Sequence, residues 1–170
     1  MTIQTLIKLV ADGAVLPIIV LAGYALLFLI PKGARFEAYA RILMAGLTAY
    51  LLAKLLGAVY QPATERPFEI LGVAAGASYL NNPGFPSDHA LFAAFLTLAV
   101  WFETRHKWIS ITLAILTVAV CVGRVLALVH TPLDVIGGIL VASVGALWYL
   151  QRDEKIFTKP TRQKHQNSLQ

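Results

Sequence analysis

Five apolar runs alternate with polar connections along the 170-residue chain. They cover residues 14–30, 42–60, 89–102, 108–129 and 133–150. A helix rises about 1.5 Å per residue, so the first run, which carries no charge, covers about 26 Å and can cross a bilayer with local thinning. The pattern predicts an all-α integral membrane protein, a bundle of five transmembrane helices.

A shorter amphipathic segment precedes the first run. Apolar residues recur at Ile3, Leu6, Ile7 and Val10, the spacing of one helical face. This spacing predicts an interfacial N-terminal helix, and the bundle has six spans if that segment also inserts. A signal peptide is not expected, because no basic start and no small-residue cleavage site accompany a long enough core.

Composition agrees with a membrane protein. Hydrophobic residues make up 58% of the chain and charged residues 14%, against roughly 45–50% and 25% in soluble domains. No linker, repeat or low-complexity tract divides the chain, so we expect one membrane-embedded domain over residues 1–150 and a basic cytoplasmic tail over 151–170. The single cysteine, Cys121, excludes an internal disulfide and is interpreted as a core residue.

The basic residues predict how the chain is oriented. Ten of the fourteen Lys and Arg fall in the connection before the second span, in the connection before the fourth, and in the tail. Basic connections are retained in the cytoplasm, so the long connection 61–88 is expected outside. The net charge of +5 then reflects topology rather than a basic face, and nucleic-acid binding is not expected.

The side predicted to face outward carries a group of unusual polar residues. Ionisable side chains at membrane depth are costly and indicate a functional site. Guanidinium groups match phosphate oxygens and imidazoles exchange protons near neutral pH, so the group favours a phosphate site. A metal site is disfavoured, because the two arginines would repel a divalent cation. The residues are Glu65, Arg66, Ser87, Asp88, His89, Arg124, His130 and Asp134.

The stretch NPGFPSDHA, residues 82–90, opens the third span. Its prolines stop a helix before Ser87, which can act as an N-cap. The amides of Asp88 and His89 would then face whatever lies at the helix mouth, and a phosphoryl oxygen suits them. The alternative is that Ser87 only caps the helix and Asp88 only complements its dipole.

A second stretch, residues 123–134, also allows two interpretations. His130 and Asp134 are four residues apart, so the carboxylate can hold one imidazole nitrogen and fix the tautomer. That arrangement prepares a nucleophilic histidine. The alternative is structural, since Thr131, Pro132 and Asp134 resemble an ordinary helix start.

Three motifs in this region resemble the signatures of the type 2 phosphatidic acid phosphatase superfamily. They are Arg66-Pro67, Pro86-Ser87-Asp88-His89, and Arg124-x5-His130-x3-Asp134, in the order found in the family, and the resemblance covers residues 61–150. The chain departs from the family pattern at three positions. The usual Lys seven residues before Arg66 is Val59, the usual Gly of the second motif is Asp88, and the usual Ser before Arg124 is Gly123. Asp88 is associated with the bacterial undecaprenyl pyrophosphate phosphatase-like branch.

The resemblance implies phosphoryl transfer through a phosphohistidine, without metal or other cofactor. In the mechanism that the resemblance implies, His130 attacks phosphorus, Asp134 orients His130, and His89 protonates the leaving oxygen and then activates water. The expected catalytic residues are therefore His130, His89 and Asp134. The expected phosphate-binding residues are Arg66, Ser87, Asp88 and Arg124.

The expected partners are the bilayer and a membrane lipid phosphate. The resemblance implies undecaprenyl pyrophosphate, hydrolysed to undecaprenyl phosphate on the extracytoplasmic side of the bacterial cytoplasmic (inner) membrane. Phosphatidic acid or phosphatidylglycerol phosphate is the alternative substrate. A different class of function is a non-catalytic lipid-phosphate binder or transporter, motivated by Val59 at the position of the family's Lys.

Overall fold

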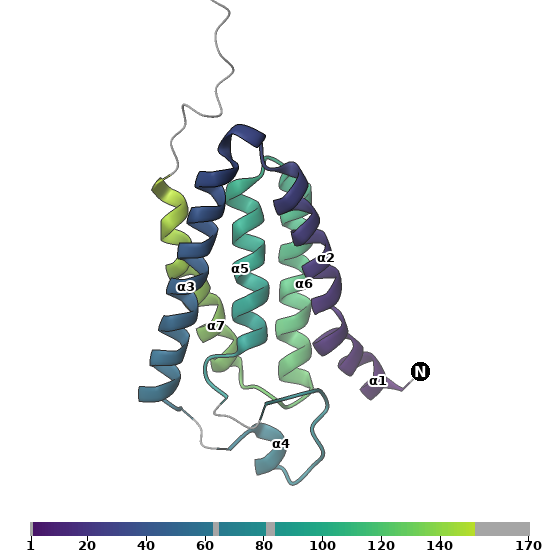
Figure 1. The fold of residues 1–170 in the computed structure, drawn as a ribbon. Coiled ribbons are helices and arrows are strands. Elements are labelled where there is room, and N and C mark those ends of the chain that lie inside the picture. The colour runs from purple at the N-terminus through teal and green to yellow at the C-terminus, as the bar shows by residue number, and fades with distance from the viewer. Residues whose placement is uncertain (1, 63–64, 81–83, 152–170) are drawn as a thin grey trace, which may run out of the picture.

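The computed structural model describes residues 2–62, 65–80 and 84–151. Within these ranges the chain is helical and has no β-strand, which confirms the all-α prediction (Figure 1). The α-helices described are α1 (Ile3–Lys8), α2 (Val15–Tyr24), α3 (Arg35–Val59), α4 (Pro67–Ile70), α5 (Asp88–Glu103), α6 (Lys107–Leu126) and α7 (Pro132–Gly145). They are accompanied by π-helical turns η1 (Leu9–Gly13) and η2 (Ala25–Leu29), and by 3₁₀ turns η3 (Lys32–Ala34) and η4 (Ala146–Gln151).

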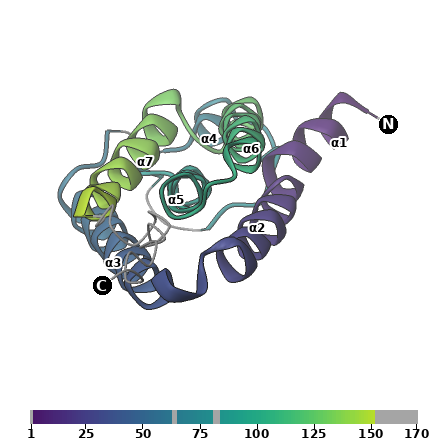
Figure 2. The same ribbon diagram turned by 90° about the horizontal axis from the view of Figure 1, so that it is seen from above.

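All five predicted spans are helical, and the protein is a multi-pass membrane protein. In the described part of the chain, four helices are long and apolar enough to cross a membrane: Ile3–Leu29, Lys32–Val59, Lys107–Leu126 and Pro132–Gln151. Helix α5 is shorter, with 16 residues, and lies in the middle of the bundle with α2, α3, α6 and α7 around it (Figure 2). Its contacts are therefore mainly with protein rather than lipid.

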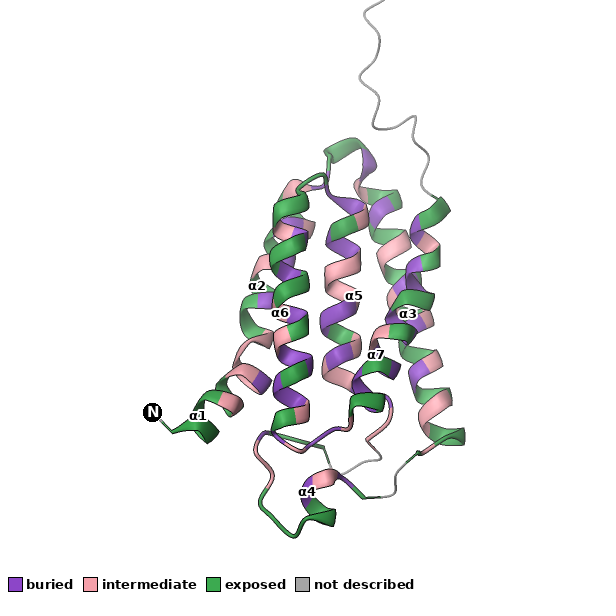
Figure 3. Cartoon of the chain, turned by 180° about the vertical axis from the view of Figure 1, so that it is seen from behind, coloured by how far each residue is buried: buried purple, intermediate pink, exposed green. Residues whose placement is uncertain are grey.

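The bundle is held together by small side chains. Helix α5 buries Ala90, Ala93, Ala94 and Ala99, and α3 buries alanines at four-residue spacing, including Ala45 and Ala49. Small residues let helix backbones approach closely in a membrane, where apolar burial alone does not drive association. Exposed residues cover much of the outer surface of the helices, as expected for faces that contact lipid (Figure 3).

The N-terminal segment differs from the sequence-based expectation. Residues Ile3–Leu29 form one helical stretch that counts as a single candidate span, so α1 adds no sixth span, and an interfacial position for α1 stays a prediction. The π-turn η1 joins α1 to α2 just before Pro17. Proline cannot donate a hydrogen bond to the carbonyl four residues earlier and its ring crowds that carbonyl, which accounts for an irregular turn at this point.

The bundle has two different ends. The connections between α2 and α3 and between α5 and α6 lie at one end, with the end of η4 (Figure 1). Helix α4 and the beginnings of α5 and α7 lie at the other end (Figure 1). The predicted cytoplasmic tail, residues 151–170, lies outside the described residues apart from Gln151.

Two adjacent glycines in α7 bring α5 against it. The ring of Phe85 packs on Gly137, and a Cβ atom at Gly138 would lie 2.7 Å from the Ser87 carbonyl oxygen and 2.9 Å from the Leu91 nitrogen. Ser87 also donates its backbone N–H to the Asp134 carbonyl, at 2.9 Å. The glycines thus fix the start of α5 against the start of α7.

Replacing Gly138 by Ala is expected to destabilise the bundle. The added methyl meets backbone atoms that cannot move aside without separating α5 from α7, and overpacking of this kind costs about 1–3 kcal/mol. Thermal unfolding in detergent measures the loss. Gly23→Ala is the control, because a Cβ at Gly23 meets nothing within 4 Å. Equal unfolding temperatures for the two variants would contradict the tight α5–α7 contact.

Candidate functional site

The three motifs meet at the end of the bundle where α5 and α7 begin. Arg66 and Pro67 begin α4, Ser87 caps α5, and Arg124 lies in the last turn of α6. His130 lies in the short connection between α6 and α7, and Asp134 in the first turn of α7. The structure thus brings the motif segments together from three separate parts of the chain.

His130 and Asp134 support both interpretations of their spacing. Asp134 Oδ2 accepts a hydrogen bond from the Thr131 amide at 2.7 Å, and Thr131 Oγ1 accepts one from the Asp134 amide at 3.2 Å, so the helix start is a capping box. The same Oδ2 lies 3.6 Å from His130 Nδ1. That distance is too long for a hydrogen bond, and Nδ1 has no hydrogen-bond partner among the described residues. Catalytic hydrogen bonds are often long before substrate binds.

Arg66 lies beside this pair. Its guanidinium donates to the carbonyl oxygens of Val129 and Leu80 and stands over the Tyr79 ring. A Cβ atom placed on Gly84 would lie 3.5 Å from Asp134 Oδ2 and 3.8 Å from both Arg66 Nη1 and His130 Nδ1. These three side chains therefore gather around the backbone of Gly84.

In this structure Ser87 caps the start of α5. The residue is fully buried, and its Oγ accepts a long hydrogen bond of 3.5 Å from the Ala90 amide. Its own amide is taken by the Asp134 carbonyl. The capping interpretation of Ser87 is confirmed, and a contact between its hydroxyl and phosphate stays a prediction.

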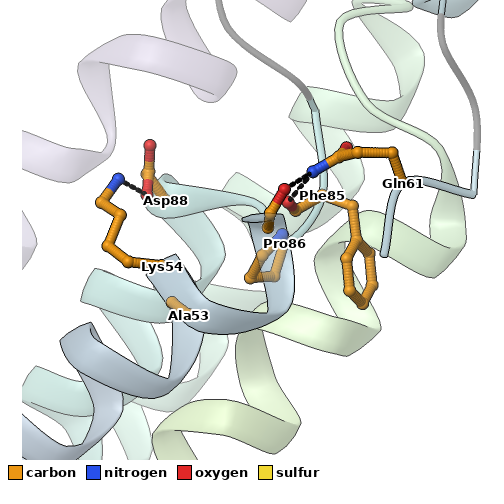
Figure 4. Close-up of a pocket in the computed structure, with 7 residues that line it drawn as sticks. Ala53, Lys54, Gln61, Phe85, Pro86 and Asp88 are labelled. Atoms are coloured by element: carbon orange, nitrogen blue, oxygen red, sulfur yellow. Dashed lines mark hydrogen bonds and ion pairs between the residues drawn. The ribbon is translucent and has the colours of Figure 1, made fainter. Parts of the chain in front are cut away.

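The Asp88 side chain forms an ion pair with a neighbouring helix. It pairs with Lys54 of α3 at 3.7 Å, and both side chains are about half exposed (Figure 4). The two residues line a half-open pocket of about 220 Å³ together with Gly57, Phe85 and Pro86. Phosphate binding through the main-chain amide of Asp88, at the first position of α5, stays a prediction.

Arg124 is the most deeply buried of the predicted site residues that carry a charge, with 1% of its surface exposed. Its Nη1 donates to Asp12 Oδ1 at 2.8 Å. Its Nε is buried and has no hydrogen-bond partner in the described part of the chain. His89 lies within electrostatic reach of Arg124 and His130, which places both imidazoles in the same cluster.

Sequence reasoning did not identify Asp12 as part of this cluster. Asp12 belongs to the N-terminal helix and also accepts hydrogen bonds from Ser78, through the backbone N–H and the hydroxyl. One signal was present in the sequence, because Asp12 is an acidic residue inside a long apolar helix, where a charge is costly without a partner.

The pKa of His130 lies below the usual 6.5. Burial is the main cause, since it disfavours the charged imidazolium, and the positive charges of Arg124 and Arg66 act in the same direction. Asp134 opposes them. The lowered pKa favours the neutral imidazole, which carries the lone pair that nucleophilic attack needs. Among the described residues, no three His, Cys, Asp or Glu side chains come together as a metal site would require.

Comparison with known proteins agrees with this geometry. A stretch of 67 residues is 39% identical to the protein named "Putative undecaprenyl-diphosphatase YbjG" of Escherichia coli (strain K12). That match covers 39% of this chain and 33% of the relative. No solved structure matches the chain. Residues 36–157, which contain all three motifs, match the model of the PAP2 superfamily. The chain therefore belongs to the PAP2 superfamily, as its motifs indicated.

Proposed function

We propose that the protein is a membrane phosphatase that hydrolyses a lipid phosphate through a phosphohistidine. The observation that carries the proposal is the cluster of His130, Asp134, Arg66 and Arg124 at one end of a bundle of apolar helices. A lipid substrate can keep its chain in the bilayer while its headgroup reaches this end. Membership of the PAP2 superfamily supports the same chemistry.

In the first step, His130 attacks the terminal phosphorus. Its Nδ1 lies toward Asp134, so Nε2 is the attacking nitrogen. The N–P bond forms as the bond from phosphorus to the leaving oxygen breaks, and His89 gives that oxygen a proton. The two guanidinium groups and the amides at the start of α5 stabilise the charge on the equatorial oxygens.

In the second step, water releases the phosphate. Neutral His89 takes a proton from water, the oxygen attacks phosphorus, and the N–P bond breaks with its electrons returning to His130. The products are inorganic phosphate and the lipid with one phosphoryl group fewer. Every group in both steps belongs to this chain or to water, and we propose that no metal takes part.

The acid side of the pH profile is expected to report His130. Protonation below its lowered pKa removes the attacking lone pair, so kcat/KM should fall with a midpoint below pH 6.5. Phosphate groups of the substrate also titrate near pH 6, so the profile is measured with two lipids that differ in headgroup. A midpoint shared by both belongs to the enzyme. A shared midpoint above 6.5 would mean that Asp134 outweighs burial.

We propose undecaprenyl pyrophosphate as the substrate and undecaprenyl phosphate as the lipid product. Asp88 in the second motif and the name of the E. coli relative support this choice. The distribution of Lys and Arg supports an active site on the extracytoplasmic side of the bacterial inner membrane. Phosphatidic acid and phosphatidylglycerol phosphate are the competing substrates.

The experiment is phosphate release by purified protein in detergent with EDTA present. Undecaprenyl pyrophosphate, phosphatidic acid and phosphatidylglycerol phosphate are compared at equal concentration, and a His130→Ala sample gives the background. We expect release that persists in EDTA and is fastest with the pyrophosphate. Loss of activity in EDTA, restored by added Mg²⁺, would contradict the metal-free mechanism, and a faster rate with phosphatidic acid would change the substrate.

A non-catalytic lipid-phosphate binder is the second candidate. Val59 stands where the family has a phosphate-binding Lys, and its side chain is 71% exposed at the end of α3. Lys54, the nearest lysine on that helix, is paired with Asp88. The binder predicts that a folded sample binds these lipids and releases no phosphate from any of them.

A further inference from the structure

The carboxylate of Asp12 joins two distant segments at the proposed phosphate site. One oxygen, Oδ1, accepts from Arg124 Nη1 at 2.8 Å. The other, Oδ2, accepts from the backbone N–H and the hydroxyl of Ser78, both at 2.9 Å. Asp12 thereby connects the N-terminal helix, the end of α6 and the connection that carries Arg66.

Close backbone packing fixes this junction. A Cβ atom on Gly123 would lie 2.9 Å from both the Cα and the nitrogen of Ala11, so the N-terminal helix touches α6 immediately beside Arg124. Gly76 approaches α6 in the same way, where a Cβ would lie 2.9 Å from the Ala127 Cα. Both contacts require glycine. Asp12 is therefore held next to Arg124 by the packing of its neighbours, rather than reaching it from a flexible surface.

The described residues do not satisfy all the hydrogen-bond donors of Arg124. A guanidinium carries five N–H donors in a fixed plane, and Asp12 takes one of them through Nη1. The Nε donor is buried and unpaired within the described residues. An unpaired buried donor costs free energy, and here it belongs to a residue that the proposed mechanism aims at phosphate. A phosphoryl oxygen would satisfy it.

We propose that Asp12 is a positioning residue for Arg124. It holds the guanidinium at Nη1 so that the remaining donors are directed to the phosphoryl oxygens as charge develops on them. The inference rests on the proposed function, in which Arg124 binds the phosphoryl group. The fixed plane of the guanidinium makes one anchored nitrogen sufficient to orient the others.

The opposite role for Asp12 is competition with phosphate for Arg124. A competing carboxylate has to leave when substrate arrives. Asp12 has hydrogen bonds on both oxygens and belongs to a helix whose backbone contacts α6 directly. These contacts favour positioning. The two roles predict opposite effects when the charge of Asp12 is removed, so one variant separates them.

The test is Asp12→Asn, measured on the lipid that wild type hydrolyses fastest. Asparagine has nearly the same shape but cannot accept hydrogen bonds with both end atoms. We expect kcat to fall about 10- to 100-fold with KM nearly unchanged, because misdirected donors stabilise the transition state less than aligned ones do. Complete removal of such a donor lowers kcat by about 10²–10³-fold. Ser78→Ala is a graded comparison at the same junction. It removes one of the two hydrogen bonds from Ser78 to Asp12 and keeps the Arg124 contact, so we expect a smaller loss, within about 5-fold of wild type.

A double-mutant cycle distinguishes positioning from a general structural effect. Asp12→Asn is introduced into an Arg124→Gln protein, with size-exclusion profiles and thermal midpoints confirming that each variant is folded. If Asp12 acts through Arg124, its substitution has no further effect on kcat in that background. Equal losses in both backgrounds would overturn the proposal, as would activity of Asp12→Asn at or above the wild-type level.

Binding of orthovanadate gives a readout that does not need turnover. Vanadate imitates the phosphoryl group in transfer, and its affinity is measured by calorimetry across the same cycle. Weaker binding in Asp12→Asn, only where Arg124 is present, supports positioning even if no lipid is hydrolysed and the proposed function fails. Unchanged or tighter binding in Asp12→Asn overturns it, and so does the absence of vanadate binding to wild type.

Discussion

Replacing His130 by Ala is expected to abolish phosphate release, with a loss on the order of 10⁴-fold or more. The imidazole supplies the atom that bonds to phosphorus in the proposed mechanism, in which His89 acts as acid and base rather than as nucleophile. The rate is measured with undecaprenyl pyrophosphate in detergent, at saturating substrate. Binding of the lipid should persist, because both arginines remain.

His106→Ala is the matched control for this variant. His106 is exposed in the connection between α5 and α6, at the end of the bundle opposite the site. Its removal should leave the rate unchanged, and that result separates loss of the nucleophile from any general effect of losing an imidazole. A rate for His130→Ala within 10-fold of wild type would assign the attack to another group.

Replacing Asp134 by Asn is expected to lower kcat by about 10²- to 10⁴-fold, with little change in stability. The amide oxygen can still accept from Thr131, so the start of α7 is preserved. The negative charge that orients His130 and stabilises its positive form during the reaction is lost, and the wrong tautomer becomes accessible. Phosphate release and thermal unfolding are measured on the same sample.

Thr131→Ala tests the structural interpretation of the same residues. It removes the hydroxyl that accepts from the Asp134 amide and keeps the carboxylate. Loss of such a cap costs about 1 kcal/mol of stability, and activity should stay close to wild type. If Thr131→Ala and Asp134→Asn reduced activity equally, Asp134 would act only as part of the helix start.

The sequence predicted the parts of the fold that depend on local patterns. Each of the five apolar runs proved to be helical, and four of them belong to helices long and apolar enough to cross a membrane, because a helix in lipid must be apolar over most of its surface. The N-cap at Ser87 and the capping box at Thr131 and Asp134 followed from short-range spacing. The family motifs named residues that the structure brings to one end of the bundle.

Contacts between distant segments were not predictable in the same way. Asp12 and Arg124 are 112 positions apart, and their contact depends on how closely Gly123 allows the first helix to approach. The direction of Asp88 depends on Lys54 lying across from it on α3. Neither ion pair follows from a repeating pattern in the sequence, so only the packed bundle reveals which charged side chains meet.

The central claim is that His130 becomes phosphorylated during turnover. The most direct measurement is rapid acid-free quenching of wild type with substrate labelled in its terminal phosphate, followed by peptide mass spectrometry under alkaline conditions, where phosphohistidine survives. We predict a phosphoryl group on His130 that forms within one turnover and is absent in His130→Ala. Continued phosphate release with no phosphorylated histidine at any time, and with the label passing directly to water, would contradict the account.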